Sequence, residues 1–379
     1  MRLAIVLAAI LGIIGCMIVP HVKSTLVEEF GVDHHIWGDL LQKYVKKNQT
    51  LEGISLSTVD YEGMKEDERF EKYIKSFELI NFSKFDGEKD RETLIALFAN
   101  MYNALAMKMT IEYPCKRDVF GYCDQRIGSI VDSGGNGLPL SEKFVDTVWK
   151  RRVFNIGGEE WSLDDVENYL RGHPRSELPS NAPQQLYKPD FRLHANIVCA
   201  SISCPDIYNQ AFFPELLDMQ LTLNINSFLG NKEKGLNVIS NNLHMSKIFF
   251  WFEQDFVKAV ANSNNTYEKT NFAPIGFLLN YLYPDSFAYK TLSSNHFKTI
   301  KKEEIQFFDY NWNINAEKGK QVQCENTRRC FVFEQLIITI VVVTLFVLCI
   351  CCLFCVVCCF LCCYCIRQKR QKKGYTTIL

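Results

Sequence analysis

Reactive side chains are concentrated in residues 193–207, which read LHANIVCASISCPDI. This segment places the imidazole of His194 and the thiols of Cys199 and Cys204 within a run that is otherwise apolar or small. The Pro-Asp pair that follows Cys204 suits the first turn of a helix, where the macrodipole stabilises a thiolate over a thiol. The pattern therefore predicts an activated thiol at Cys204.

Less reactive arrangements of the same residues are also compatible with the sequence. Buried free cysteines are commonly inert, and Cys199 and Cys204 could instead form a short disulfide beside a satisfied core imidazole at His194. Two cysteines and one histidine could also bind zinc, although their spacing is not that of a zinc ribbon or finger. Nothing in the sequence indicates a cofactor.

Two buried amides are expected on a helix that precedes this segment. Residues 93–111 are apolar almost all round, which predicts a buried helix. Asn100 and Asn103 are three positions apart and share one face of it. Because buried amides need hydrogen-bond partners, they would either tie the helix to a loop or orient a catalytic imidazole.

A paired carboxylate is expected on the surface of a second helix. Ser162 is a good N-cap, and Glu167 and Arg171 follow at the spacing of an i,i+4 pair. The simplest interpretation of Glu167 is a surface ion pair with Arg171.

The remaining pattern predicts one helix-rich α+β domain over residues 25–315, because no internal repeat or linker interrupts it. A Gly-rich stretch at 133–137 lacks the Lys of a P-loop and is expected to be a turn. The aromatic stretch 243–256 is expected to cover a core face, with His244 structural. Helices are expected at 34–44, 65–77, 214–230 and 272–283, and strands at 153–156 and 305–315.

Composition excludes two classes of protein. The 379 residues are 47% hydrophobic and 22% charged, which excludes a disordered chain. The formal net charge of -1 gives no reason to expect a nucleic-acid partner.

Both ends of the chain resemble membrane-targeting segments. Residues 1–24 resemble a secretory signal peptide or an uncleaved signal anchor, and the context of Cys16 also resembles a bacterial lipoprotein box. Residues 336–366 carry no charge and are long enough to span a bilayer. The basic tail at 367–379 then predicts a type I membrane protein, with residues 316–335 as a stalk.

The cytosolic end carries two expected signals. The juxtamembrane thiols are candidates for S-acylation, and the alternative is that they pack as small apolar residues. These thiols belong to Cys358, Cys359, Cys362, Cys363 and Cys365. Tyr375 and Ile378 form a Tyr-x-x-Ile motif of the kind that clathrin adaptors bind as an extended strand. We therefore expect the endosomal or lysosomal membrane, with the plasma membrane as the alternative.

The segment between these ends is expected to lie in an oxidising compartment. Glycosylation sequons begin at Asn48, Asn81 and Asn264. Cys115 with Cys123, and Cys324 with Cys330, are close enough in sequence to form disulfides, although spacing alone does not fix the pairing.

Several blocks, occurring in one order over residues 90–315, resemble the family called domain of unknown function 547. Phe98 stands where the family has Trp, and Ala200 where Gly usually follows the first Cys. The family has no settled activity, so the resemblance implies a shared domain without supplying its chemistry. The blocks are Asn100-Met-Tyr-Asn-Ala-Leu105, Phe154-Asn-Ile-Gly-Gly158, Ser162-Leu-Asp-Asp-Val-Glu167 with Leu170-Arg171, His194 with Cys199 and Ser203-Cys204-Pro205, 243–256 and 310–315.

The resemblance is a reason to consider the shared polar residues together. A thiol nucleophile needs a base, and the base needs a third group to orient it. We expect Cys204 as nucleophile, His194 as base, and Asn103 or Glu167 as the orienting group, in a luminal thiol hydrolase or acyl-transferase that forms a covalent thioester. The alternative is a non-catalytic luminal receptor or scaffold with a Cys199–Cys204 disulfide.

Overall fold

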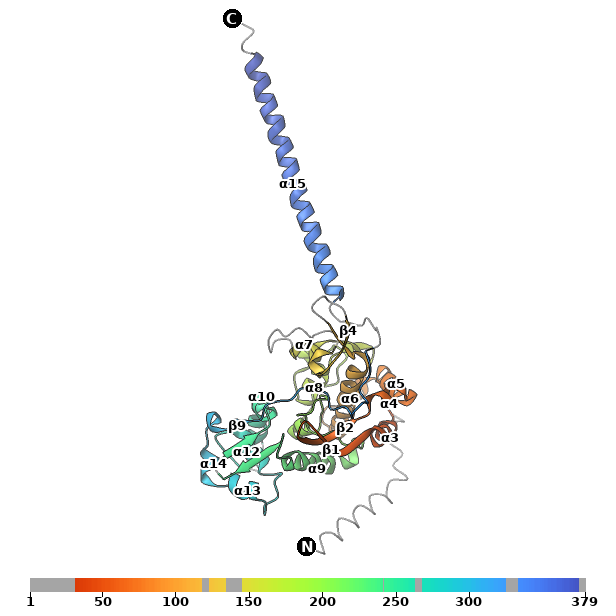
Figure 1. Cartoon of the computed structure of the whole chain (residues 1–379), viewed down its shortest axis with the longest axis vertical. Helices are drawn as coiled ribbons and strands as arrows, with labels where there is room; N and C mark the ends of the chain where they lie inside the picture. The colour runs from red at the N-terminus through yellow and green to blue at the C-terminus, as the bar shows by residue number, and fades with distance from the viewer. Residues whose placement is uncertain are drawn as a thin grey trace. The chain divides into compact units, whose positions relative to one another are not determined.

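The computed structural model describes residues 31–117, 123–133, 145–240, 242–262, 268–324 and 333–374. The chain divides into two compact units, Met1–Arg328 and Arg329–Leu379 (Figure 1). The first unit mixes helices with small antiparallel and parallel sheets, which confirms the predicted α+β class.

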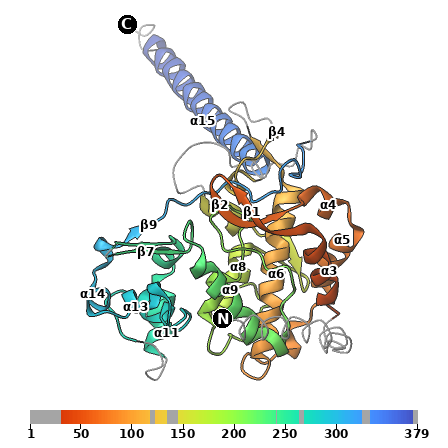
Figure 2. The same ribbon diagram turned by 60° about the horizontal axis from the view of Figure 1, so that its bottom comes forward.

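The first unit is built around helix α6 (Arg91–Glu112), which is buried continuously from Leu94 to Met107. Its apolar character on every side explains this burial. In Figure 2, α6 lies between α3 (His34–Tyr44), α4 (Tyr61–Glu66) and α5 (Glu68–Ser76) on one side and α8 (Leu163–Leu170) on the other. The helices predicted at 34–44 and 93–111 are confirmed.

The helix predicted at 65–77 is divided into α4 and α5 by Asp67. The carboxylate of Asp67 accepts a hydrogen bond from the backbone N–H of Arg69 and so caps the start of α5.

Among the described residues, the strands form four small sheets. β7, β8 and β9 form a three-stranded sheet and the other strands form antiparallel pairs. Of the strand predicted at 305–315, only the two residues of β9 form a strand. Asn313 and Ile314 instead make isolated β-bridges to Ser129 and Ser201. The strands are β1 (Val45–Leu51), β2 (Ile54–Val59), β3 (Cys115–Arg117), β4 (Cys123–Arg126), β5 (Phe154–Ile156), β6 (Glu159–Trp161), β7 (Leu236–Ile239), β8 (Asn242–Met245) and β9 (Gln306–Phe307).

The later part of the unit has an aromatic core that includes Phe249, Phe256 and Phe277. The stretch 243–256 therefore covers a core face, as predicted. The helices of this later part of the unit are α9 (Leu217–Gly230), α10 (Ile248–Trp251), α11 (Glu253–Ala261), α12 (Ala273–Leu278), α13 (Phe287–Leu292) and α14 (Asn295–Thr299).

The remaining elements are short. They are α7 (Val145–Lys150) and the 3-10 helices η1 (Phe77–Leu79), η2 (Phe82–Lys84), η3 (Ile130–Asp132), η5 (Arg175–Glu177), η6 (Phe191–Ala195), η7 (Pro214–Leu216) and η8 (Lys302–Glu304).

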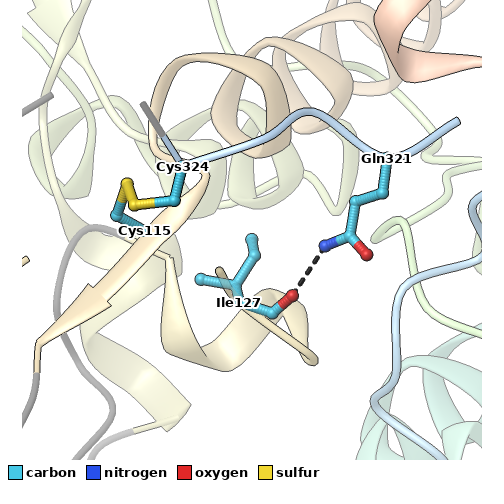
Figure 3. Close-up of a disulfide and its surroundings, with 4 residues drawn as sticks. All are labelled: Cys115, Ile127, Gln321 and Cys324. Atoms are coloured by element: carbon cyan, nitrogen blue, oxygen red, sulfur yellow. Dashed lines mark hydrogen bonds between the residues drawn. A yellow bond between two sulfur atoms is a disulfide. The ribbon is translucent and has the colours of Figure 1, made fainter. Parts of the chain in front are cut away.

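A disulfide joins Cys115 to Cys324 across 209 positions (Figure 3). It replaces the two local pairings that spacing suggested. Beside it, the side-chain amide of Gln321 donates to the carbonyl of Ile127 at 2.6 Å. Residues 316–324, which the sequence pattern assigned to a stalk, are therefore attached to the domain, and Glu317 also pairs with Lys46.

The second unit contains α15 (Phe333–Gly374). Its segment Val342–Leu361 has a mean hydropathy of 3.2 and none of it is buried, so by length and composition it is a candidate membrane span. Helix α6 meets the same criteria, but 94% of its apolar 18-residue window is buried in the core of the first unit.

Several predictions lie outside the described residues. These are the signal segment 1–24, Asn264, Cys330, and the sorting residues Tyr375 and Ile378. The other two sequon residues, Asn48 and Asn81, are exposed, as are the thiols of Cys358 and Cys359.

Candidate active site

A pocket of about 420 Å³ gathers most of the reactive residues that the sequence suggested. It is lined by His194, Cys199, Cys204 and Glu167, and by several aromatic side chains. Asn103 is not among its lining residues. A volume of this size is typical of a small-ligand site.

His194 is presented by η6, whose start is capped by the carboxylate of Asp190. Its Nε2 atom lies 3.0 Å from Oδ2 of Asp255 on α11, and its ring stacks on Phe252 at 4.2 Å between centroids. Because Asp255 accepts the Nε2 proton, Nδ1 is left as the unprotonated nitrogen. Nδ1 has no hydrogen-bond partner among the described residues.

Asp255 is fully buried and stays ionised. Burial alone would raise its pKa, but hydrogen bonds from His194 and Arg171 outweigh burial and hold the pKa well below its ordinary value. Its second oxygen lies 3.5 Å from Nζ of Lys258. In the sequence, Asp255 stands out only as a carboxylate within the strongly aromatic stretch 243–256. That pattern was not enough to assign Asp255 to the site.

Burial lowers the pKa of His194, and the hydrogen bond to Asp255 offsets this only in part. The imidazole is therefore neutral at neutral pH. A neutral imidazole held by a carboxylate is the form that can accept a proton from a thiol.

The two thiols are in direct contact. Their Sγ atoms are 2.7 Å apart, and the backbone N–H of Cys199 donates to Sγ of Cys204. Sγ of Cys199 also lies 3.2 Å from Oγ of Ser201 and 3.5 Å from Oη of Tyr310.

The thiol at position 199 is the more easily ionised. Burial raises the pKa of Cys199, but hydrogen bonds from Cys204, Ser201 and Tyr310 outweigh burial and lower it below the ordinary thiol value. Burial and the neighbouring Cys199 both raise the pKa of Cys204. Hydrogen bonding therefore favours a thiolate at Cys199, whereas the sequence pattern favoured Cys204.

The helix expected after Cys204 does not form, so no macrodipole acts on its thiol. The carboxylate of Asp206 does not cap a helix. It accepts instead from the backbone N–H of Ser57 and from the amine of Lys234.

Lys234 fixes the backbone of the cysteine loop, a role that no local sequence signal indicates. Its side chain is only 2% exposed, and its amine donates to Asp206 and to the carbonyls of Ile202 and Cys204. A buried ammonium is stable only when it is paired and hydrogen-bonded in this way.

The two asparagines of α6 are structural. Asn100 exchanges two hydrogen bonds with the backbone of Phe212. Asn103 donates to the carbonyl of Asn196 and accepts from the N–H of Val198. Asn103 therefore ties α6 to the reactive segment, and Asn100 ties it to the chain just after that segment. Asp255 takes the orienting role expected of Asn103 or Glu167.

Glu167 is buried in the pocket and does not form the predicted surface ion pair. Arg171 bonds Asp255 instead, at 2.6 Å. Burial raises the pKa of Glu167 to about 7, with Arg171 offsetting part of the effect. Near neutral pH this carboxyl is therefore present in both protonation states.

Metal ligation has little support in this site. No group of three or more His, Cys, Asp or Glu side chains could hold a metal ion within the part of the chain that the structure describes. His244 lies on β8, where it contacts Phe308, and it is not a lining residue of the pocket.

Comparison with known proteins finds a family similarity over part of the chain, and this similarity supplies no chemistry. Residues 87–229 match the family described as "Protein of unknown function, DUF547". The match includes His194, both thiols and Glu167, but it ends before Asp255 and before the family blocks expected at 243–256 and 310–315. No curated protein and no solved structure matches the chain.

Proposed function

We propose that this protein is a thiol-dependent hydrolase or acyl-transferase in which Cys199 is the nucleophile and His194, oriented by Asp255, is the base. One observation carries the proposal: the buried His194–Asp255 pair and the thiol with the lowered pKa line the same pocket. Covalent catalysis needs a nucleophile, a base and an orienting group, and the site supplies one of each. Among the described residues, neither thiol is hydrogen-bonded to His194, so substrate binding must bring the thiol and the base within reach of each other.

The reaction proceeds in two steps. The Cys199 proton passes to His194, and the thiolate attacks the carbonyl carbon of an ester, thioester or amide. A thioester to Cys199 forms, the bond to the leaving group breaks, and the leaving group takes the proton from His194. Water, or another acceptor in a transferase, then attacks the thioester with its proton taken by His194, and the Cys199 thiol is restored.

Two neighbours support these steps. Tyr310 has its pKa raised by burial, so its phenol remains protonated and can donate to the thiolate. Glu167 can act as a proton donor or acceptor near neutral pH, because its pKa of about 7 suits general acid–base work.

We further propose that the protein is a type I glycoprotein of the endosomal or lysosomal membrane, with the plasma membrane as the alternative. The apolar segment of α15 and the basic residues after it support the topology. Exposed Asn48 and Asn81 support glycosylation. Recognition of Tyr375 and Ile378 by a clathrin adaptor, and S-acylation of the thiols from Cys358 to Cys365, belong to the same proposal.

A second candidate is a non-catalytic receptor or scaffold with a Cys199–Cys204 disulfide. The 2.7 Å between the two sulfur atoms favours it, because an approach of only about 0.7 Å would bring them to the length of a disulfide bond. An oxidising lumen favours the same outcome.

Differential alkylation of the full-length protein, before and after reduction, distinguishes the two candidates. Mass spectrometry of the peptide that holds both thiols reports which sulfur reacts. Rapid alkylation of Cys199 without reduction supports the thiol enzyme. A peptide that alkylates only after reduction would show the disulfide and replace the enzyme proposal with the receptor.

A further inference from the structure

A cluster of aromatic rings lies beside Cys199 in the wall of the pocket. It includes Tyr310, whose hydroxyl lies 3.5 Å from Sγ of Cys199 and whose ring packs on Trp251 at 4.8 Å between centroids. The ring of Tyr310 packs on Trp312 at 4.4 Å, and Trp312 contacts Trp149 at 5.5 Å and Trp251 at 5.6 Å between centroids. All four residues line the pocket, and we call them the aromatic wall.

The wall reaches from the buried thiol to the surface. Tyr310 is adjacent to Cys199, whereas the side chain of Trp251 is 43% exposed. A group bonded to Sγ of Cys199 therefore begins beside Tyr310, and the indole rings of Trp312 and Trp251 lie next to Tyr310.

The charged side chains of the pocket come mostly from other elements, the exception being Lys150, which follows Trp149 on α7. Asp164, Glu167 and Arg171 belong to α8 or its end, and Arg171 is already bonded to Asp255 and packed on Phe252. The wall itself is built from α7, α10 and residues 310–312. Along the wall, a ligand meets rings that favour apolar groups and offer few hydrogen-bond partners.

On the basis of the function proposed above, we propose that the substrate is an ester or thioester of a medium-length apolar acyl group, whose chain lies on the aromatic wall. The acyl group is the part of the substrate that becomes bonded to Cys199, so it is the part that the wall can hold in both steps. A pocket of about 420 Å³ lies in the lower part of the usual range for small-ligand sites, which favours a medium chain over an extended lipid.

The test is a chain-length series measured on the full-length protein in nanodiscs. The kcat/KM for 4-nitrophenyl acetate, butyrate and hexanoate is compared, with Cys199→Ala giving the background. Burial of each added methylene is expected to raise kcat/KM by up to about fourfold. Trp312→Ala should lower the hexanoate-to-acetate ratio towards one, and Trp312→Phe should give an intermediate ratio.

Two further variants keep the result interpretable. Trp251→Ala, at an exposed position, should also lower the ratio and does not depend on Trp312→Ala folding. Phe287→Ala removes an aromatic ring that is 61% exposed and is not a lining residue of the pocket, so the ratio should remain at its original value.

The outcomes separate this inference from the proposed function. Hydrolysis that depends on Cys199 but is independent of chain length would overturn the substrate class and leave the thiol enzyme in place. A chain-length preference unaffected by the Trp312 and Trp251 variants would overturn the placement of the acyl chain. Absence of any Cys199-dependent hydrolysis and of Cys199 alkylation would overturn both proposals.

Discussion

The imidazole of His194 is held at 3.0 Å by the carboxylate of Asp255, a residue 61 positions later in the chain. The first residue lies within the matched region 87–229 and the second lies outside it. The candidate site is therefore assembled from the matched region and from the aromatic core that follows it. A fragment that ends at residue 229 would lack the group that orients the base.

Replacing Asp255 tests this relationship. Asp255→Asn keeps the shape but removes the charge and allows the wrong tautomer of His194, so we expect Cys199-dependent kcat/KM to fall by about a hundredfold or more. The pH profile of kcat/KM measures the effect. Asp285→Asn, at an exposed carboxylate that pairs with exposed Lys290, is the matched control and should change kcat/KM little. Equal activity of the Asp255 variant and the native protein would remove Asp255 from the mechanism.

The two thiols are expected to respond differently to substitution. Cys199→Ala should abolish rapid alkylation near neutral pH. Cys204→Ala should leave Cys199 reactive but slow it, because loss of the hydrogen bond from Cys204 raises the pKa of Cys199 and moves the alkylation profile to higher pH. Iodoacetamide rates between pH 6 and about 9 measure both effects. If alkylation instead persists in Cys199→Ala and disappears in Cys204→Ala, then Cys204 is the nucleophile.

Glu167 should make stability depend on pH. Its pKa in the folded protein, about 7, is above the ordinary value of 4.5, so the folded state binds the proton more tightly than the unfolded state. This contribution is fully present below pH 4.5 and is lost as pH rises through about 7, with a total of up to about 3 kcal/mol.

Glu167→Gln removes that pH dependence. Urea unfolding at pH 5 and about pH 8 should show the stability of the variant rising relative to the native protein by about 2 kcal/mol or more at the higher pH. The exposed Glu303→Gln is the control and should show no such divergence. A constant difference between Glu167→Gln and the native protein would mean that Glu167 titrates normally.

Local patterns predicted the helices well but not the site. Helix α6 and its two asparagines could be predicted, because an all-apolar run with two amides on one face determines both burial and the need for partners. The contact of His194 with Asp255 and the bond of Cys115 with Cys324 could not, because each joins residues whose proximity depends on the packing of distant elements.

Which of the two cysteines has the more easily ionised thiol also depends on contacts between residues that are distant in the sequence. Cys204 was favoured by the Pro-Asp pair after it, which suits a helix start. Asp206 instead bonds Lys234 and Ser57, and no helix forms there. The hydrogen bond of Tyr310 to Cys199 spans 111 positions and has no local signal.

The cytosolic tail offers a test that is independent of the catalytic site. Tyr375→Ala should move the full-length protein from internal membranes to the cell surface, because the adaptor pocket for the tyrosine ring would be left empty. Surface biotinylation measures the shift. Thr376→Ala changes a position that the motif leaves variable and should have no effect. An unchanged distribution of the Tyr375 variant would remove the sorting proposal.

Lys234 is expected to stabilise the cysteine loop, and this can be separated from a general loss of charge. Lys234→Met leaves Asp206 and the carbonyls of Ile202 and Cys204 without their buried donor. We expect a loss of about 1–3 kcal/mol in the free energy of unfolding, since Asp206 is partly exposed and water can replace part of the interaction.

The control and the rescue identify the cause. Lys290→Met breaks an exposed ion pair and should cost no more than about 0.5 kcal/mol. Adding Asp206→Asn to Lys234→Met removes the unpaired charge and should restore part of the lost stability. Because Lys234 bonds the carbonyl of Cys204, Lys234→Met should also slow Cys199 alkylation in protein that remains folded. A stable variant with native alkylation rates would show that the loop holds its geometry without this lysine.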